Sequence, residues 1–88
     1  MKVSLIIPTK NEQGAIGRVL KEIPKNIINE IIVIDGHSTD DTAKEAKSEL
    51  RSKDKFILQE KKGFGRALQQ AFKEASGDII VIMNGDGS

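Results

Sequence analysis

The sequence contains no cysteine, which excludes disulfide bonds and zinc sites built on cysteine. It also lacks an excess of either charge. Its 14 basic and 13 acidic residues give a formal net charge of +1, so electrostatics provide no reason to expect a nucleic acid partner. No apolar stretch approaches the ~20 residues that a transmembrane helix needs. We therefore expect a soluble, cytoplasmic protein that does not bind nucleic acid.

The length of 88 residues allows one small domain. The composition, 38% hydrophobic and 31% charged, is ordinary for a soluble globular fold. The chain has no repeat, low-complexity tract or linker that would divide it. We expect residues 1–88 to form a single domain.

Three nearly continuous, β-branched apolar runs predict strands that are covered on both faces, and a weaker run predicts a fourth. These strands should lie near residues 3–8, 30–35, 55–59 and 78–83. Apolar residues at helical spacing fill the intervals between them. This alternation, with right-handed crossovers, predicts an α/β fold: a Rossmann-like three-layer α/β/α arrangement with a four-stranded parallel sheet of order 3-2-1-4.

Local signals indicate where the helices begin and end. Pro24 should close the first helix. Ser38, followed by Asp41 three residues later, is a capping-box pattern for the start of the second helix. Gly77 should end the third helix.

Polar side chains collect where the predicted strands end, which is where ligands bind in such sheets. Asp35 ends the second strand and could accept hydrogen bonds from a ligand, or it could only cap the next helix. For Asp40 the capping role is favoured. His37 is the only histidine and is either a ligand contact or incidental, whereas Met83 and Phe72 are expected in the core.

Two further segments each have two interpretations, one as part of a ligand-binding site and one as an ordinary turn. Residues 84–86, Asn-Gly-Asp, could help to hold a divalent cation that bridges a diphosphate, or could form an Asn-Gly turn. Residues 61–66 offer three cations and two glycines at the start of a helix. That segment could bind an anion, or it could be a solvated basic turn.

Four segments together resemble family-2 glycosyltransferases of the GT-A fold, most closely the polyprenyl-phosphate (dolichol-phosphate) hexosyltransferases. In chain order they read SLIIPTKNE at residues 4–12, IDGHSTDDT at 34–42, GFGRAL at 63–68 and SGDIIVIMNGDGS at 76–88. The resemblance covers the whole chain and implies the N-terminal, donor-binding half of that fold. The nucleotide site that it implies is formed by Pro8, Thr9, Glu12, Asp35, Gly63, Arg66 and Asn84.

The resemblance also implies a cofactor. Asp35 would contact the base, and Asp86 would coordinate Mg²⁺ or Mn²⁺ on the diphosphate of the donor. Asn84 stands where the family usually has aspartate, which removes one charge from the metal site.

The activity implied by the resemblance is metal-assisted, inverting transfer of a hexose from UDP- or GDP-hexose to a polyprenyl phosphate. In the family, the acceptor site and the catalytic base lie beyond the position of Ser88. We therefore expect no catalytic residue in this chain, and we expect the chain alone to be a truncated and inactive part of a hexosyltransferase. The alternative is a non-catalytic nucleotide-binding or assembly fragment.

Two expectations concern the surroundings of the protein. Membrane association is expected in the full-length enzyme. The fourth strand should present an open edge beside Ile80 and Ile82, and open edges favour pairing, so we expect a homo-oligomer formed through this edge.

Overall fold

The computed structural model describes residues 1–85 and contains seven elements that alternate between strand and helix. In chain order these are β1 (Val3–Thr9), α1 (Ala15–Glu22), β2 (Glu30–Asp35), α2 (Thr42–Glu49), β3 (Lys55–Leu58), α3 (Phe64–Glu74) and β4 (Ile79–Ile82).

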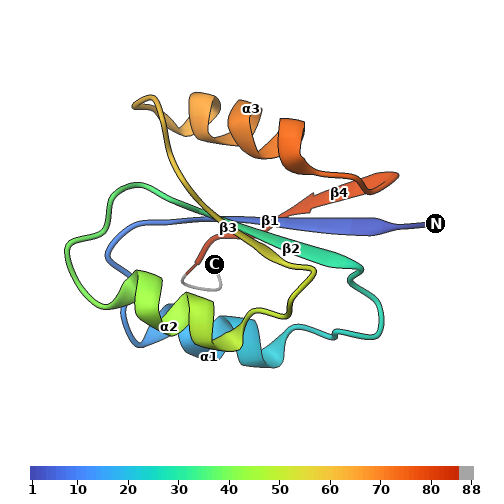
Figure 1. The fold of residues 1–88 in the computed structure, drawn as a ribbon, viewed down its shortest axis with the longest axis horizontal. Coiled ribbons are helices and arrows are strands. Elements are labelled where there is room, and N and C mark those ends of the chain that lie inside the picture. Colours follow the sequence, from blue (N-terminus) through green and yellow to red (C-terminus); the bar gives the residue numbers. More distant parts are fainter. Residues whose placement is uncertain (86–88) are drawn as a thin grey trace.

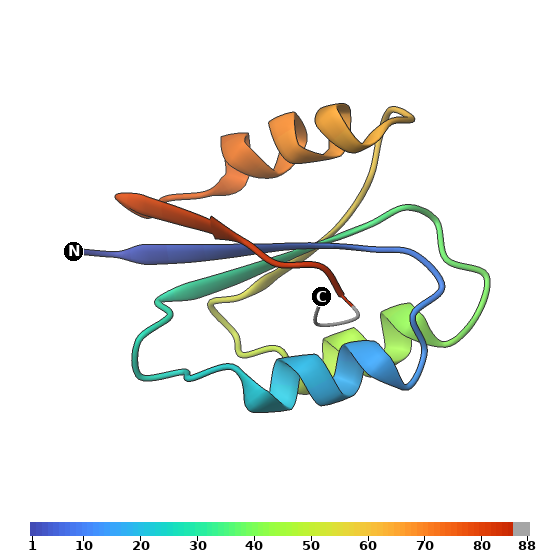
Figure 2. The ribbon, with the colours of Figure 1, turned by 180° about the vertical axis from the view of Figure 1, so that it is seen from behind.

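The strands form one parallel sheet of order β3-β2-β1-β4, sandwiched between two helical layers. Helices α1 and α2 cover one face of the sheet and α3 covers the other (Figures 1 and 2). The predicted Rossmann-like α/β/α architecture and its strand order are therefore confirmed. None of the three helices in residues 1–85 combines the length and the apolar character that crossing a membrane would require.

Strands β1 and β2 are buried on both faces, which explains why their sequences are continuously apolar rather than alternating. Successive side chains of a strand point to opposite faces, so each strand contributes to two cores. The core beneath α1 and α2 includes Leu5, Ile7, Ile16, Leu20, Ile31 and Val33. The core beneath α3 includes Ile6, Ile32, Ile34, Ala67 and Ala71.

The predicted end of α1 agrees with the structure, whereas the predicted start of α2 does not. Helix α1 ends at Glu22 and the next residue, Ile23, is extended, as expected for a residue that precedes a proline. The capping box was wrong, because α2 begins only at Thr42 and the Ser38 hydroxyl is hydrogen-bonded to Asp35. Asp41 is the N-cap and makes no capping hydrogen bond through its side chain. The preceding residue, Asp40, accepts a hydrogen bond of 3.0 Å from the backbone N–H of Thr42, so it contacts the helix start, as expected, without being the N-cap.

Two further expectations about α3 and its surroundings need correction. Gly77 does not end α3, which stops at Glu74. Phe72 is not a core residue, because α3 packs on the sheet through Ala67 and Ala71 and leaves Phe72 43% exposed. Met83, by contrast, is partly buried and packs against the core beneath α1, as expected.

Gly77 is required at a different place, where the chain enters β4. Its backbone N–H donates to the Ser4 hydroxyl at 2.8 Å, and this hydroxyl donates in turn to the carboxylate of Glu30. The same carboxylate accepts from the N–H and the hydroxyl of Ser76. Burial alone would raise the pKa of Glu30, but hydrogen bonds from Ser4 and Ser76, together with the charge of Lys55, outweigh burial and lower it. An ionised Glu30 therefore joins β1, β2 and the connection to β4.

We predict that Gly77→Ala destabilises the fold. An added Cβ would lie 2.7 Å from the backbone nitrogen of Ser4, which cannot move without disturbing β1. Overpacking of this kind costs about 1–3 kcal/mol. Urea unfolding followed by circular dichroism measures the loss. The matched control is Gly65→Ala, where the added Cβ meets nothing within 4 Å, so stability should stay level or rise by up to about 1 kcal/mol. Equal stability of the two variants would contradict the close approach at Gly77.

Strand β4 has one unpaired edge among the described residues, since it pairs only with β1. Its four apolar residues, Ile79–Ile82, are each 40–43% exposed. An apolar strand with an open edge favours pairing with another chain. We predict concentration-dependent self-association of this chain through β4, measured by light scattering.

The test of this association compares two exposed isoleucines. Ile80→Lys should weaken association about tenfold or more, because burial of such a side chain is worth about 1.5 kcal/mol and the new charge opposes pairing. Ile27→Lys, at an exposed site outside the sheet, should leave association unchanged. A wild-type chain that stays monomeric at high concentration would rule out the interface.

Candidate nucleotide-binding site

A cavity of about 810 Å³ lies over the carboxyl ends of β1, β2 and β3. This is the edge of a parallel sheet at which α/β proteins bind ligands. Its wall is formed by the three loops that follow these strands, by the start of α3 and by the segment after β4. The lining residues are Pro8, Thr9, Lys10, Glu12, Ile34, Gly36, His37, Gln59, Glu60, Lys61, Lys62, Gly63, Phe64, Ala67 and Asn84.

The loops after β1 and β2 are held together by hydrogen bonds between side chains and backbone. The Asn11 amide oxygen accepts from the N–H of Thr39 at 2.8 Å, and the Asn11 N–H donates to the Ser38 hydroxyl at 2.8 Å. One residue later, the N–H of Glu12 donates to the Thr42 hydroxyl at 2.8 Å. Asn11 adopts the left-handed conformation (φ 51°), which asparagine tolerates better than most residues. These contacts set the spacing of two walls of the cavity.

Asp35 is buried at the end of β2, only 2% exposed, and does not line the cavity. Its two carboxylate oxygens accept hydrogen bonds from the N–H and the hydroxyl of Ser38, at 2.9 and 2.6 Å. In this structure Asp35 holds the loop that carries His37. Its contact with a base stays a prediction.

Glu12 is held at the mouth of β1 by its own loop. The Thr9 hydroxyl donates to its carboxylate at 2.9 Å, and the N–H of Lys10 lies 3.3 Å from the same oxygen. The segment after β4 closes over this pair: a Cβ added to Gly85 would lie 2.7 Å from the Glu12 carboxylate and 2.8 Å from the Thr9 hydroxyl. Only glycine therefore fits at position 85 without a shift of its neighbours.

The basic loop between β3 and α3 is positioned by Gln59. Its amide nitrogen donates to the carbonyl oxygens of Lys61 and Gly63, at 2.6 and 3.0 Å. The backbone carbonyl oxygen of Gln59 lies 2.7 Å from Nε2 of His37. Gly63 has a positive φ of 109°, which an L side chain would strain. Gln59 thus links the loop after β2 to the basic loop.

The structure brings together five of the predicted nucleotide-site residues and separates two. Pro8, Thr9, Glu12, Gly63 and Asn84 line the cavity. Asp35 lies beneath it, and Arg66 lies in a neighbouring cavity along α3. His37, for which two readings were open, is at the cavity wall.

The sequence placed the loop from Gln59 to Arg66 at the ligand-binding edge, but no individual role was predicted for Gln59 or Phe64. Both line the cavity, and Phe64 is 59% exposed there. The available signal was position, since Gln59 directly follows β3 and Phe64 begins α3.

The predicted metal ligand, Asp86, lies outside the described residues. Within residues 1–85, no three acidic, histidine or cysteine side chains are grouped closely enough to hold a metal ion. The donors that the described part does place beside this segment are oxygens, from the Glu12 carboxylate, the Thr9 hydroxyl and the amide of Asn84. Oxygen donors suit Mg²⁺ and Mn²⁺, and the small number of protein ligands suits a cation that also takes phosphate oxygens.

A parallel sheet covered on both faces, with a cavity over its carboxyl ends and a glycine-rich basic loop at a helix start, defines a Rossmann-like α/β domain, a class that binds ligands at this edge of the sheet. The comparison with protein families is more specific. Residues 4–88 match Glycosyl transferase family 2, and the chain belongs to this family.

Two relatives illustrate how this chain compares with longer proteins. It is 42% identical over 92 residues to a dolichol-phosphate mannosyltransferase from Pyrococcus furiosus. This alignment covers 98% of this chain and 26% of the relative. The chain is 34% identical over 85 residues to Protein RfbJ from Shigella flexneri, covering 96% of this chain and 64% of that protein. The chain thus spans about a quarter to two thirds of the length of these relatives.

Solved structures confirm that the fold corresponds to the N-terminal half of the GT-A fold. A glucosyl-3-phosphoglycerate synthase from Mycobacterium tuberculosis, crystallised with UDP, superposes with a TM-score of 0.85 at 29% identity over 97% of this chain and 34% of the synthase. The same synthase has been crystallised with Mn²⁺, UDP and glucosyl-3-phosphoglycerate, with a TM-score of 0.83 at 28% identity, covering 96% of this chain and 33% of the synthase.

Proposed function

We propose that this chain is the donor-binding part of a hexosyltransferase and that its 810 Å³ cavity holds the nucleotide of a UDP- or GDP-hexose. The observation that carries the proposal is the position of this cavity at the carboxyl ends of three parallel strands, in a chain that belongs to a glycosyltransferase family. Two crystal structures of one structural neighbour, the synthase described above, contain UDP, which supports a nucleotide as the ligand.

The cavity has separate regions suited to the different parts of a nucleotide. Pro8, Thr9 and Glu12 offer an apolar surface, a hydroxyl and a carboxylate on the β1 side. On the opposite side, Lys61 and Lys62 flank Gly63 at the start of α3. Cations beside a helix N-terminus favour phosphate groups, so we assign the diphosphate to the space between this basic loop and the segment after β4, and the nucleoside to the β1 and β2 loops.

A divalent cation, when bound, would neutralise charge on the diphosphate leaving group. Asp86 and the amide oxygen of Asn84 would hold it, with Glu12 beside them. Because asparagine keeps an oxygen donor but lacks the charge of aspartate, these residues alone should bind the metal weakly and depend on the phosphates to complete its shell.

The proposed acceptor is a polyprenyl phosphate, supported by the 42% identity to a dolichol-phosphate mannosyltransferase. A phosphate acceptor is already anionic and needs little help from a base, so inverting transfer by direct displacement would rest mainly on binding and orientation. We assign no catalytic residue to this chain and expect it to be inactive alone, with acceptor binding supplied by the longer enzyme. The second candidate is a fragment that binds nucleotide without catalysis, which the partial coverage of the relatives also fits. An assay of the full-length product distinguishes these roles. Hexose transfer supports the donor-binding part of an enzyme, and nucleotide binding without transfer supports the second candidate.

We predict that Asp35→Ala weakens UDP or GDP binding by about 1–3 kcal/mol, the usual range for a lost hydrogen bond to a charged group. Isothermal titration calorimetry measures the change. Ser38→Ala is the informative companion, because it removes one partner of Asp35 and keeps the carboxylate. If Asp35 acts by holding its loop, Ser38→Ala should lose part of the same affinity. If Asp35 reads the base directly, Ser38→Ala should bind almost normally. Unchanged affinity in folded Asp35→Ala would remove Asp35 from the binding site.

We predict that Mn²⁺ tightens nucleotide binding and that Asp86→Ala abolishes this effect. Asn84→Asp should enlarge it, because a second carboxylate joins the metal site. By linkage, nucleotide should tighten Mn²⁺ by the same factor, which a titration in the reverse order checks. Asp41→Ala, at an exposed aspartate of the α2 start, is the control and should keep the full Mn²⁺ effect. Nucleotide binding that ignores Mn²⁺ in both the wild type and Asn84→Asp would refute the metal site.

A further inference from the structure

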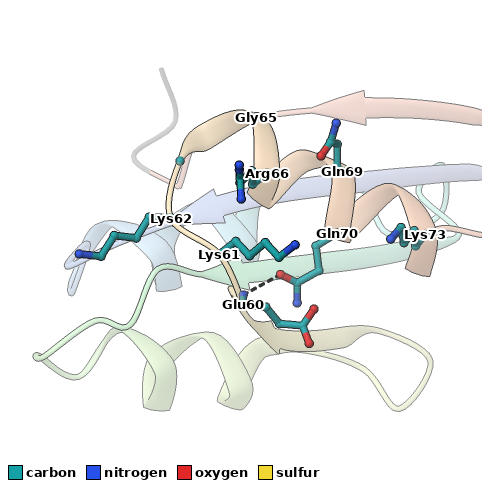
Figure 3. A pocket seen from close by; sticks show the side chains of 9 residues that line it. Glu60, Lys61, Lys62, Gly65, Arg66, Gln69, Gln70 and Lys73 are labelled. Carbon is teal, nitrogen blue, oxygen red and sulfur yellow. Dashed lines mark hydrogen bonds between the residues drawn. The ribbon is translucent and has the colours of Figure 1, made fainter.

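A second cavity of about 670 Å³ lies along α3, and the proposed nucleotide binding accounts only for the wall, residues 60–63, that it shares with the first cavity. Figure 3 shows its lining side chains on the basic loop and along the helix. Four cations and a single carboxylate line it, together with two glutamines and two glycines. These residues are Glu60, Lys61, Lys62, Gly63, Gly65, Arg66, Gln69, Gln70 and Lys73.

The four cations of this surface, which we call the α3 basic face (Lys61, Lys62, Arg66 and Lys73), are exposed and free of salt bridges. The salt bridges found within residues 1–85 involve only Lys21 with Glu49 and Arg51 with Asp54. The side chains of the basic face donate no hydrogen bond to another described residue, whereas Lys55 and Lys25 both donate to carbonyl groups. The fold therefore does not use these cations for its own stability.

The backbone beneath the α3 basic face is nevertheless rigidly held. The Gln70 amide oxygen accepts from the N–H of Glu60 and its amide nitrogen donates to the carbonyl of Leu58, both at 2.8 Å (Figure 3). Lys61 extends toward Gln70, while Lys62 points away from the other cations (Figure 3). The charges are thus presented from a fixed surface and not from a loose tail.

The positive charge is concentrated here and is not a property of the whole chain. The lining carries four positive charges and one negative charge, a net +3, while the chain as a whole carries +1. The remainder of the molecule is therefore net negative, at −2. A large, uniformly anionic partner would be attracted to this side of the molecule and repelled elsewhere.

Two exposed aromatic side chains accompany the cations on the same helix. Phe64 is 59% exposed and Phe72 is 43% exposed. Neither is needed for the core beneath α3, which Ala67 and Ala71 complete. Lysine and arginine beside exposed phenylalanine is the combination that binds the headgroup region of a membrane, where the charges meet anionic lipids and the rings enter the interface.

We propose that the α3 basic face binds the surface of an anionic lipid membrane. The nucleotide cavity and this face share residues 60–63 as a common wall, and Phe64 lies at their boundary. Docking through α3 would therefore place the donor cavity next to the lipid surface, from which a lipid-linked phosphate could approach. This last consequence rests on the proposed function, while membrane binding itself does not.

The experiment is sedimentation of the chain with vesicles of phosphatidylcholine alone, or of phosphatidylcholine with about a third phosphatidylglycerol, a lipid that supplies the anionic surface. Binding should occur only to the anionic vesicles and should fall as salt is added. The triple variant Lys61→Gln, Arg66→Gln, Lys73→Gln should bind roughly 100-fold more weakly, at about fivefold for each cation removed. The control triple Arg18→Gln, Lys44→Gln, Lys53→Gln removes the same charges from exposed sites of the α1 and α2 layer and should lose less than fivefold.

A second pair of variants tests the aromatic contribution at constant charge. Phe72→Ser should weaken binding to anionic vesicles several-fold. Ile27→Ser, at an apolar site away from α3 that is more exposed than Phe72 (59% against 43%), should not.

Three results would overturn the proposal. The first is that the wild type binds neither vesicle type, or binds both equally. The second is that the two triple variants lose the same amount of binding. The third is that inorganic phosphate releases more protein from the vesicles than sodium chloride does at the same ionic strength. The last result would indicate a small-anion site in place of a lipid surface. Titration of the same proteins with UDP and Mn²⁺ separates the two proposals, since a chain that binds vesicles but not UDP retains this inference and loses the proposed function.

Discussion

The burial of β1 and β2 on both faces and along both edges is the constraint on which the rest of the structure depends. Each strand has a strand neighbour on either side and helices above and below. Their registers are therefore fixed, because a slip of one residue would exchange the two cores. Fixed registers bring the ends of β1 and β2 level, with Thr9 opposite Asp35. The loops that follow must consequently share one edge, and the cavity forms there.

Polar side chains convert this shared edge into a defined site. Backbone groups in the loops form hydrogen bonds with the side chains of Asp35, Asn11 and Gln59. No buried side-chain nitrogen or oxygen among the described residues lacks a hydrogen-bond partner. A site held in this way is preorganised, so less ordering is required when a ligand binds.

The two ends of the sheet differ in structure, and so do its two faces. The amino end is closed by an ionised network around Glu30, and Asp54 plays a similar role beside β2, where it accepts from the N–H of Ile31 and pairs with Arg51. The carboxyl end carries the 810 Å³ cavity. On the faces, α1 and α2 only cover the core, whereas α3 combines packing with an outward basic surface. Stability and recognition are thus separated in space, so that substitutions at the site need not unfold the domain.

The sequence by itself determined the elements of this protein, while the tertiary structure decided the partners of its polar residues. The continuous β-branched runs identified the strands because burial on both faces leaves no alternation, and Pro24 marked the end of α1 because a proline restricts its predecessor. The same sequence could not reveal that Ser38 binds Asp35 instead of capping α2, or that Gly77 approaches Ser4. Nor could it show that Arg66 lines only the second cavity, whereas Gly63 lines both. Local patterns record the preferences of neighbouring residues, whereas these contacts depend on how segments distant in the chain are packed against one another.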